Sequence, residues 1–184
     1  MQNIWHKGRH RTEGFDVIDR QAIGSRGVNA LLPHVWRPDL AGLLPPDPGV
    51  FHGPTLAIWL TGFMLTVATA RSLVHLFAPD GGAHSIATID TGVAGGRNIV
   101  AIFGQWGAMQ LILAGLLWVL LLRYRGLTPL ILCALLCEPF LRALSARLKP
   151  IETVGVAPGH RYNWLPVPVV VLTLYLSLCP AGPV

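Results

Sequence analysis

Residues 99–148 read IVAIFGQWGAMQLILAGLLWVLLLRYRGLTPLILCALLCEPFLRALSARL. This stretch is two long apolar segments, 99–122 and 127–148, joined by the short polar turn Arg123-Tyr124-Arg125-Gly126. A helix needs about 20 mostly apolar residues to cross the hydrocarbon core of a bilayer, and each segment is long enough. The stretch therefore predicts a hairpin of two membrane-spanning helices.

The composition of the whole chain agrees with a membrane protein. Of its 184 residues, 52% are hydrophobic and only 12% are charged, with a mean hydropathy of +0.53, whereas soluble domains average about 25% charged residues. The net charge of +5 comes from scattered basic residues rather than from a basic stripe interleaved with aromatic residues, so we expect no nucleic-acid partner. The three cysteines lie in apolar segments, which does not resemble a secreted disulfide framework.

Two further apolar segments, 54–77 and 164–179, flank the hairpin. Together the four segments predict an all-α integral membrane protein, a four-transmembrane-helix bundle covering residues 54–184. Gly104 and Ala108 form a pair of small residues four apart, and Gly107 widens this helix-packing face, which favours close approach of a neighbouring helix.

Residues 1–53 differ in composition from the rest and predict an extramembrane tail. They contain six of the fourteen basic residues and five of the nine acidic ones, and we find no apolar core typical of a secretory signal. Apolar residues recur every three or four positions over 28–44, which predicts an interfacial amphipathic segment interrupted at Pro33 and Pro38. The proline-rich stretch 45–49 then predicts an extended spacer.

Glu138 and Arg142 are the most informative polar residues, because they lie one helical turn apart inside an apolar segment. Charges in hydrocarbon cost free energy unless they are paired or face the interior of the bundle, and they are often functional. Two interpretations stay open: a structural clamp between helices, or a proton or substrate site. The full candidate cluster of intramembrane polar residues, structural or ligand-binding, is Arg71, His75, Gln105, Gln110, Glu138 and Arg142.

The sequence offers little for metal or catalytic chemistry. Cys133 and Cys137 share a helix face, but the second half of a zinc site is missing. His75 is the one histidine inside a predicted span, whereas a b-type haem needs two. No nucleophile and base with a known motif are visible either. We therefore expect no catalytic residues, no metal and no cofactor, with a bound lipid or quinone as the open alternative.

An even number of spans places both termini on the same side of the membrane. Basic residues near the spans are almost balanced between the two sides of the membrane, so our prediction of the orientation rests on the long basic tail. We expect a multi-pass protein of a bacterial inner membrane with both termini in the cytoplasm.

Several features together resemble the small four-helix DoxX-like membrane proteins. They are Gly-Gly-Arg-Asn at 95–98, the small-residue span 104–115, the arginine-bearing turn, and Leu-Arg-Ala-Leu at 141–144. The resemblance covers about residues 54–178. It implies a compact four-helix bundle and, in some members, association with quinone-linked redox complexes. It supplies no catalytic motif to match.

Two functional hypotheses follow. The first is a non-catalytic accessory subunit of a larger membrane complex, with quinone-linked electron transfer as the suggested setting, because the charged tail is suited to lie along a partner. Its expected partners are membrane lipids and other membrane protein subunits. The alternative is a small transporter, or a quinone- or lipid-binding protein, that uses the polar cluster. An enzyme ranks third because no catalytic set is present.

Overall fold

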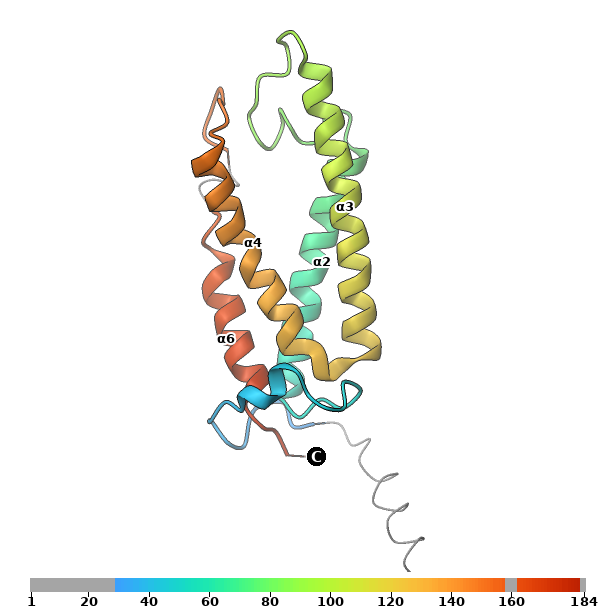
Figure 1. Cartoon of the computed structure of the whole chain (residues 1–184), viewed down its shortest axis with the longest axis vertical. Coiled ribbons are helices and arrows are strands. Elements are labelled where there is room, and N and C mark those ends of the chain that lie inside the picture. The colour runs from blue at the N-terminus through green and yellow to red at the C-terminus, as the bar shows by residue number, and fades with distance from the viewer. Residues whose placement is uncertain (1–28, 158–161, 183–184) are drawn as a thin grey trace, which may run out of the picture.

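The structure is a computed structural model that describes residues 29–157 and 162–182. Within these residues the chain is all-helical and contains no strand. The helices are η1 (Leu40–Leu43), α2 (Thr55–Phe77), α3 (Gly96–Arg123), η2 (Arg125–Leu127), α4 (Thr128–Leu148) and α6 (Pro166–Leu178). Figure 1 shows the four α-helices running side by side along the long axis of the molecule.

Three helical stretches are long and apolar enough to cross a membrane: Thr55–Phe77, Gly96–Arg123 and Arg125–Leu148. They correspond to the first three predicted spans, and the expectation of an all-α, multi-pass membrane protein is confirmed at this level. Pro129 occupies the first turn of α4, where its missing N–H costs no intrahelical hydrogen bond. Only about a quarter of the residues in the apolar windows of the three stretches are buried within the isolated chain, as expected for helices with surfaces that face lipid.

The fourth predicted span is not confirmed as a complete crossing. Helix α6 has 13 residues, or about 20 Å at 1.5 Å per residue, against about 30 Å of hydrocarbon. It begins beside the middle of α4, where the buried Asn163 side chain donates a hydrogen bond to the Pro139 carbonyl (3.1 Å). Helix α6 therefore accompanies the half of α4 that adjoins η2, as Figure 1 also shows.

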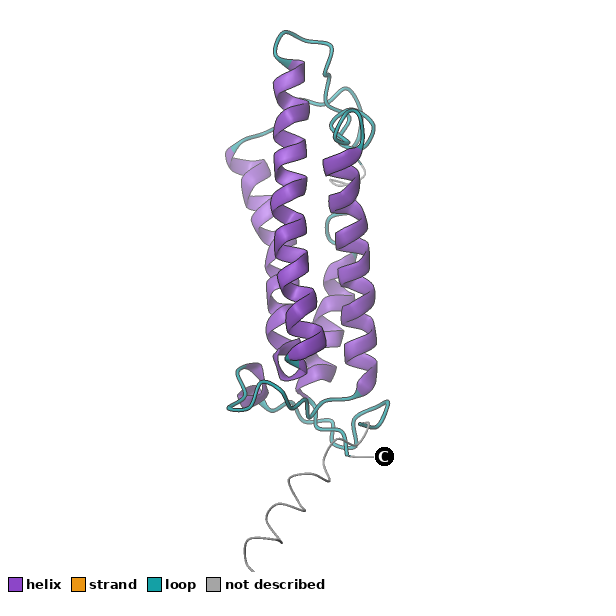
Figure 2. Cartoon of the chain, turned by 90° about the vertical axis from the view of Figure 1, so that its right-hand side faces the viewer, coloured by secondary structure: helices purple, strands orange, loops and turns teal. Residues whose placement is uncertain are grey.

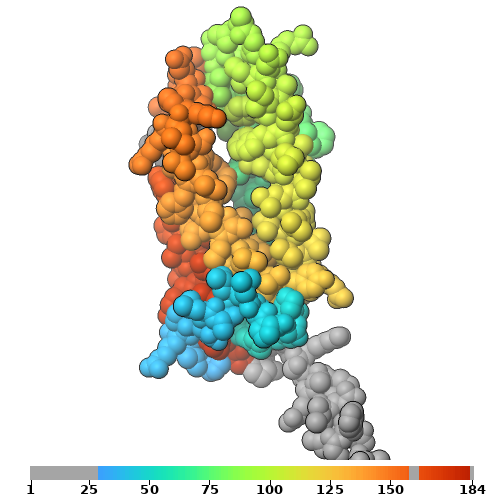
Figure 3. Space-filling view, viewed as in Figure 1, coloured from blue at the N-terminus to red at the C-terminus, as the bar shows by residue number. Residues whose placement is uncertain are grey.

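The helices form two pairs, with α2 packed mainly on α3 and α4 mainly on α6. The pairs converge at the end of the bundle that carries η2, where Leu65 of α2, Leu117 and Leu121 of α3, and Ile131 of α4 form a buried cluster. Towards the other end α4 leans away from α3 (Figure 1), and the space-filling view shows the surface hollowed between them (Figure 3). We call this hollow the α3–α4 furrow.

Helices α2 and α3 approach closely at Gly107. A Cβ atom there would lie 2.7 Å from the Leu76 amide nitrogen and 2.9 Å from the His75 carbonyl carbon. At Gly104, by contrast, the nearest atom would be 4.0 Å away. Of the two glycines in the predicted packing face, Gly107 is thus the one that the helix spacing requires.

Residues 29–54 lie across the converging end of the bundle, and Figure 2 shows these loops gathered beneath the helix ends. The Asn29 side chain donates to the carbonyls of Phe51 (2.7 Å) and Gly53 (2.8 Å). The Gly126 amide of η2 donates to the Pro48 carbonyl (2.9 Å), and the Ala30 amide donates to the Gly182 carbonyl (3.0 Å). This capping segment therefore joins the start of α2, the α3–α4 turn and the residues after α6.

The predicted amphipathic segment 28–44 forms one short helix, η1, within its described residues, and Val28 lies outside them. Asp39 begins η1 by accepting a hydrogen bond from the Ala41 amide. Several apolar side chains of the segment are strongly exposed, among them Leu31, Trp36 and Leu40. The rest of the predicted tail, residues 1–28, also lies outside the described part of the chain.

Candidate functional site: an intramembrane charge cluster

Glu138 binds two arginines through the same carboxylate oxygen. Arg71 of α2 donates from Nη2 to Glu138 Oε1 at 2.8 Å, and Arg142, one turn further along α4, donates to that oxygen as well. The predicted pair on one helix is therefore part of a charge cluster of three residues, Arg71, Glu138 and Arg142, that links α2 to α4.

The charge cluster lies within the membrane-spanning part of the helices. Glu138 is ten residues from each end of α4, which is about 15 Å along the helix axis. Arg71 is six residues, or about 9 Å, before the end of α2 at Phe77. At such depths an ionised side chain needs a partner or a polar surrounding.

The cluster is neither enclosed nor electrically balanced. The side chains of Arg71 and Arg142 are each 33% exposed, and that of Glu138 is 41% exposed. Two guanidinium groups against one carboxylate leave a net charge of +1. In addition, Nε of Arg71 is buried without a hydrogen-bond partner. The site thus holds more hydrogen-bond donors than its own acceptor can satisfy.

A second polar contact lies next to the cluster on the side of α3. The Ser72 hydroxyl is 3.2 Å from Gln110 Oε1 and 2.8 Å from the Ala68 carbonyl. Gln110 of α3 therefore makes a polar contact across the interface with α2. The sequence does not single out Ser72 or Asn163, because a lone serine or asparagine near an apolar segment carries no distinctive pattern.

His75 and Gln105 lie apart from the charge cluster. His75 is buried, with Nδ1 2.8 Å from the Gly81 carbonyl and its ring against Trp106 and Phe103 at centroid distances of 4.7 and 5.8 Å. This arrangement ties the end of α2 to the loop that follows it. Gln105 is exposed on α3. The structure thus brings together Arg71, Glu138 and Arg142, with Gln110 alongside.

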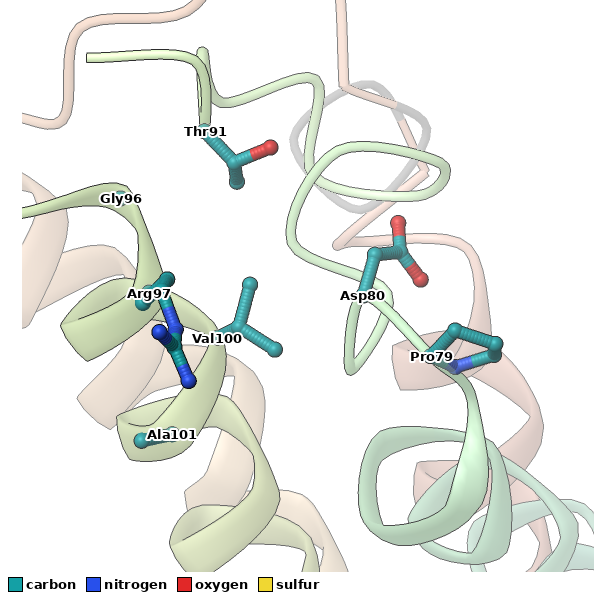
Figure 4. Close-up of a pocket in the computed structure, with 7 residues that line it drawn as sticks. All are labelled: Pro79, Asp80, Thr91, Gly96, Arg97, Val100 and Ala101. Carbon is teal, nitrogen blue, oxygen red and sulfur yellow. The ribbon is translucent and has the colours of Figure 1, made fainter.

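The loop between α2 and α3 contains a separate hollow of about 510 Å³. Its lining residues, shown in Figure 4, are Pro79, Asp80, Thr91, Gly96, Arg97, Val100 and Ala101. The Asp80 carboxylate accepts hydrogen bonds from the amides of Gly82 (2.9 Å) and Ser85 (2.7 Å). These bonds, that of Ser85 first, lower the pKa of Asp80 from 3.8 to about 2.

Figure 4 shows the two charged side chains of this hollow pointing in different directions. Arg97 lies along α3, and the Asp80 carboxylate is turned towards its own loop. The carboxylate is occupied in ordering that loop, so the hollow has no converging set of polar groups. The charge cluster is the better candidate site.

No group of three His, Cys, Asp or Glu side chains that could hold a metal ion occurs among residues 29–157 and 162–182. Comparisons with protein-family models, with curated proteins and with solved structures find no match to this chain. The resemblance to DoxX-like proteins therefore stays a prediction.

Proposed function

We propose that this chain is a non-catalytic accessory subunit of a larger membrane protein complex and that its partner covers the α3–α4 furrow. The observation that carries the proposal is the partly exposed Arg71–Glu138–Arg142 cluster at membrane depth. Acyl chains cannot solvate such a group. A polar surface supplied by another subunit removes this cost.

The short fourth helix adds to the argument. Because α6 begins beside Pro139, the half of α4 that follows Pro139 does not pack against α6. Lipid-exposed backbone without regular hydrogen bonding is not tolerated in hydrocarbon, so the turn at residues 162–165, just before α6, also favours a protein neighbour. The proposal that the complex carries out quinone-linked electron transfer is supported only by the resemblance to DoxX-like proteins.

Co-purification from native membranes in mild detergent tests the role. Leu113 lies one turn before Leu117, which packs near α4, and it is 53% exposed, so it belongs to the furrow side of α3. Leu113→Trp narrows the furrow, and we expect it to lower the amount of co-purifying subunit at least several-fold. Ile112→Trp, at the adjacent and 68% exposed position on another face, is the matched control.

Equal recovery of the subunit with both variants, or purification of the chain alone from native membranes, contradicts the proposal. A quinone- or lipid-binding role is the second candidate, favoured by the unpartnered Arg71 Nε and the neighbouring Gln110. It predicts that the chain purifies alone and that Glu138→Gln changes ligand binding at unchanged expression.

A further inference from the structure

The unbalanced charge of the cluster defines the chemistry of its missing neighbour. Arg71 and Arg142 share a single oxygen of Glu138, and the buried Nε of Arg71 has no acceptor. A guanidinium has five N–H donors in a planar fork that matches the oxygens of a carboxylate or of a phosphate. One further carboxylate beside the two arginines brings the net charge to zero and supplies the acceptors that are lacking.

We infer that the charge cluster binds a carboxylate carried by an apolar transmembrane helix of the partner, seated in the α3–α4 furrow. The inference rests on the proposed function, because it names the group with which the partner docks. It assigns Arg71 and Arg142 as the binding residues and Glu138 as the residue that holds them in position.

The depth of the cluster favours a helix over a lipid headgroup. The carboxylate of Glu138 belongs to the middle of α4, about 15 Å from either end. A lipid phosphate normally lies at the membrane surface, and bringing it to this depth removes it from water. A side chain on a transmembrane helix reaches the same depth without that displacement.

The charge balance also disfavours a second copy of this chain. Glu138 is the only acidic residue in α2, α3, α4 and α6. Two copies that meet at their furrows combine two clusters of charge +1 and remain at +2. The partner helix must therefore bring a second acid, one that the four α-helices of this chain do not supply.

Model helices provide a test that needs no identified partner. The full chain, labelled with a fluorescence donor, is reconstituted in phosphatidylcholine vesicles with acceptor-labelled Leu/Ala-rich transmembrane peptides that carry Glu or Gln at the centre. Interhelical polar contacts in model membranes are worth about 1 to 2 kcal/mol. We therefore expect the Glu peptide to associate roughly 5- to 30-fold more tightly than the Gln peptide.

The two variants of the cluster should affect the preference for the Glu peptide differently. Arg142→Gln makes the cluster neutral and should abolish the preference for Glu, whereas Glu138→Gln raises its charge to +2 and should maintain or increase it. Arg147→Gln, at an exposed position near the end of α4, is the matched control and should have no effect. A purely structural clamp predicts instead that both cluster variants act alike.

Equal association of the Glu and Gln peptides with the unmodified chain overturns the inference. This comparison uses no variant of the chain, so it does not depend on whether the variants fold. Loss of the preference when phosphatidylglycerol replaces part of the phosphatidylcholine also overturns it, because a lipid headgroup then fills the site. The proposed function can fail independently of this inference. If the chain prefers the Glu peptide but no subunit co-purifies with it, the subunit role is contradicted and the carboxylate-binding site is not.

Discussion

At the scale of single residues, glycines of α3 that look alike in the sequence have different surroundings. A Cβ atom at Gly107 would lie within 3 Å of the backbone of α2, whereas a Cβ atom at Gly115 would meet nothing within 4 Å. Backbone cannot give way as a flexible side chain does, so any side chain at residue 107 must push the two helices apart.

We therefore expect Gly107→Ala to destabilise the protein by about 1 to 3 kcal/mol. Gly115→Ala should be neutral or stabilising, because alanine is the better helix former and the position is open. Thermal unfolding in a mild detergent measures both variants. Equal shifts in the unfolding midpoint would contradict the close approach of α2 and α3.

Asp80 provides a pH-dependent prediction. Its pKa is lowered in the folded protein, so the stability that its carboxylate contributes is fully present above about pH 4 and is lost as the pH falls towards 2. Titration of the carboxyl group by carbon NMR should give a midpoint near 2, with Asp80→Asn identifying the signal. A midpoint near 3.8 would exclude the two amide hydrogen bonds.

At the scale of elements, the capping segment depends on Asn29. Its side chain donates to two carbonyls of the turn before α2, and its backbone carbonyl accepts a hydrogen bond from the Thr55 hydroxyl (2.7 Å). Asn29→Ala removes the two side-chain bonds, at a cost of about 1 to 3 kcal/mol at 0.5 to 1.5 kcal/mol each.

The loss of these two hydrogen bonds in Asn29→Ala should appear as faster proteolysis within residues 29–54 in reconstituted vesicles. Asn98→Ala, at an exposed position on α3, is the control and should leave the cleavage rate unchanged. If the two variants are cleaved alike, Asn29 does not hold the segment in place.

The long helices were predictable from the sequence, and the fourth was not. Hydropathy and the prolines and glycines at their ends gave 54–77, 99–122 and 127–148, within a few residues of α2, α3 and α4. Hydropathy does not show at which depth in the membrane a helix begins. The short length of α6 could therefore not be predicted from it. Its start is fixed by the tertiary contact between Asn163 and Pro139.

The candidate site was also predictable only in part. The spacing of Glu138 and Arg142 predicts their contact, whereas the contact with Arg71 depends on how α2 crosses α4. His75 follows Arg71 by one turn, but four residues advance a helix by 40° beyond a full turn, and the Gly81 carbonyl then binds its ring. Helical spacing alone could not separate these two residues.

At the scale of the whole molecule, the two ends of the bundle have different loops. One end carries the capping segment, η2 and the residues after α6, joined by the hydrogen bonds from Gly126 and Ala30. The other carries the loops after α2 and α4, where the Val154 amide donates to the Thr88 carbonyl (2.8 Å). The ends of the bundle should therefore face opposite sides of the membrane.

Labelling of single cysteines tests this arrangement in a chain whose three native cysteines are replaced. Asp47→Cys and Arg125→Cys should react with an impermeant reagent from one side, and Ser85→Cys and Glu152→Cys from the other. Reaction of Asp47→Cys from the cytoplasm is the outcome that our predicted orientation requires. Labelling of Asp47→Cys and Ser85→Cys from the same side would exclude the arrangement.

The hydrogen bond between Ala30 and Gly182 has a consequence for biogenesis. The ribosome makes Ala30 about 150 residues before Gly182, and Pro180 and Ala181 also bond to the capping segment, at His34 and His52. The capping segment can therefore complete these hydrogen bonds only after α6 and residues 180–182 have been synthesised. A translation product that stops at Leu178 lacks these partners, and its capping segment should be cleaved faster by proteases than that of the longer chain.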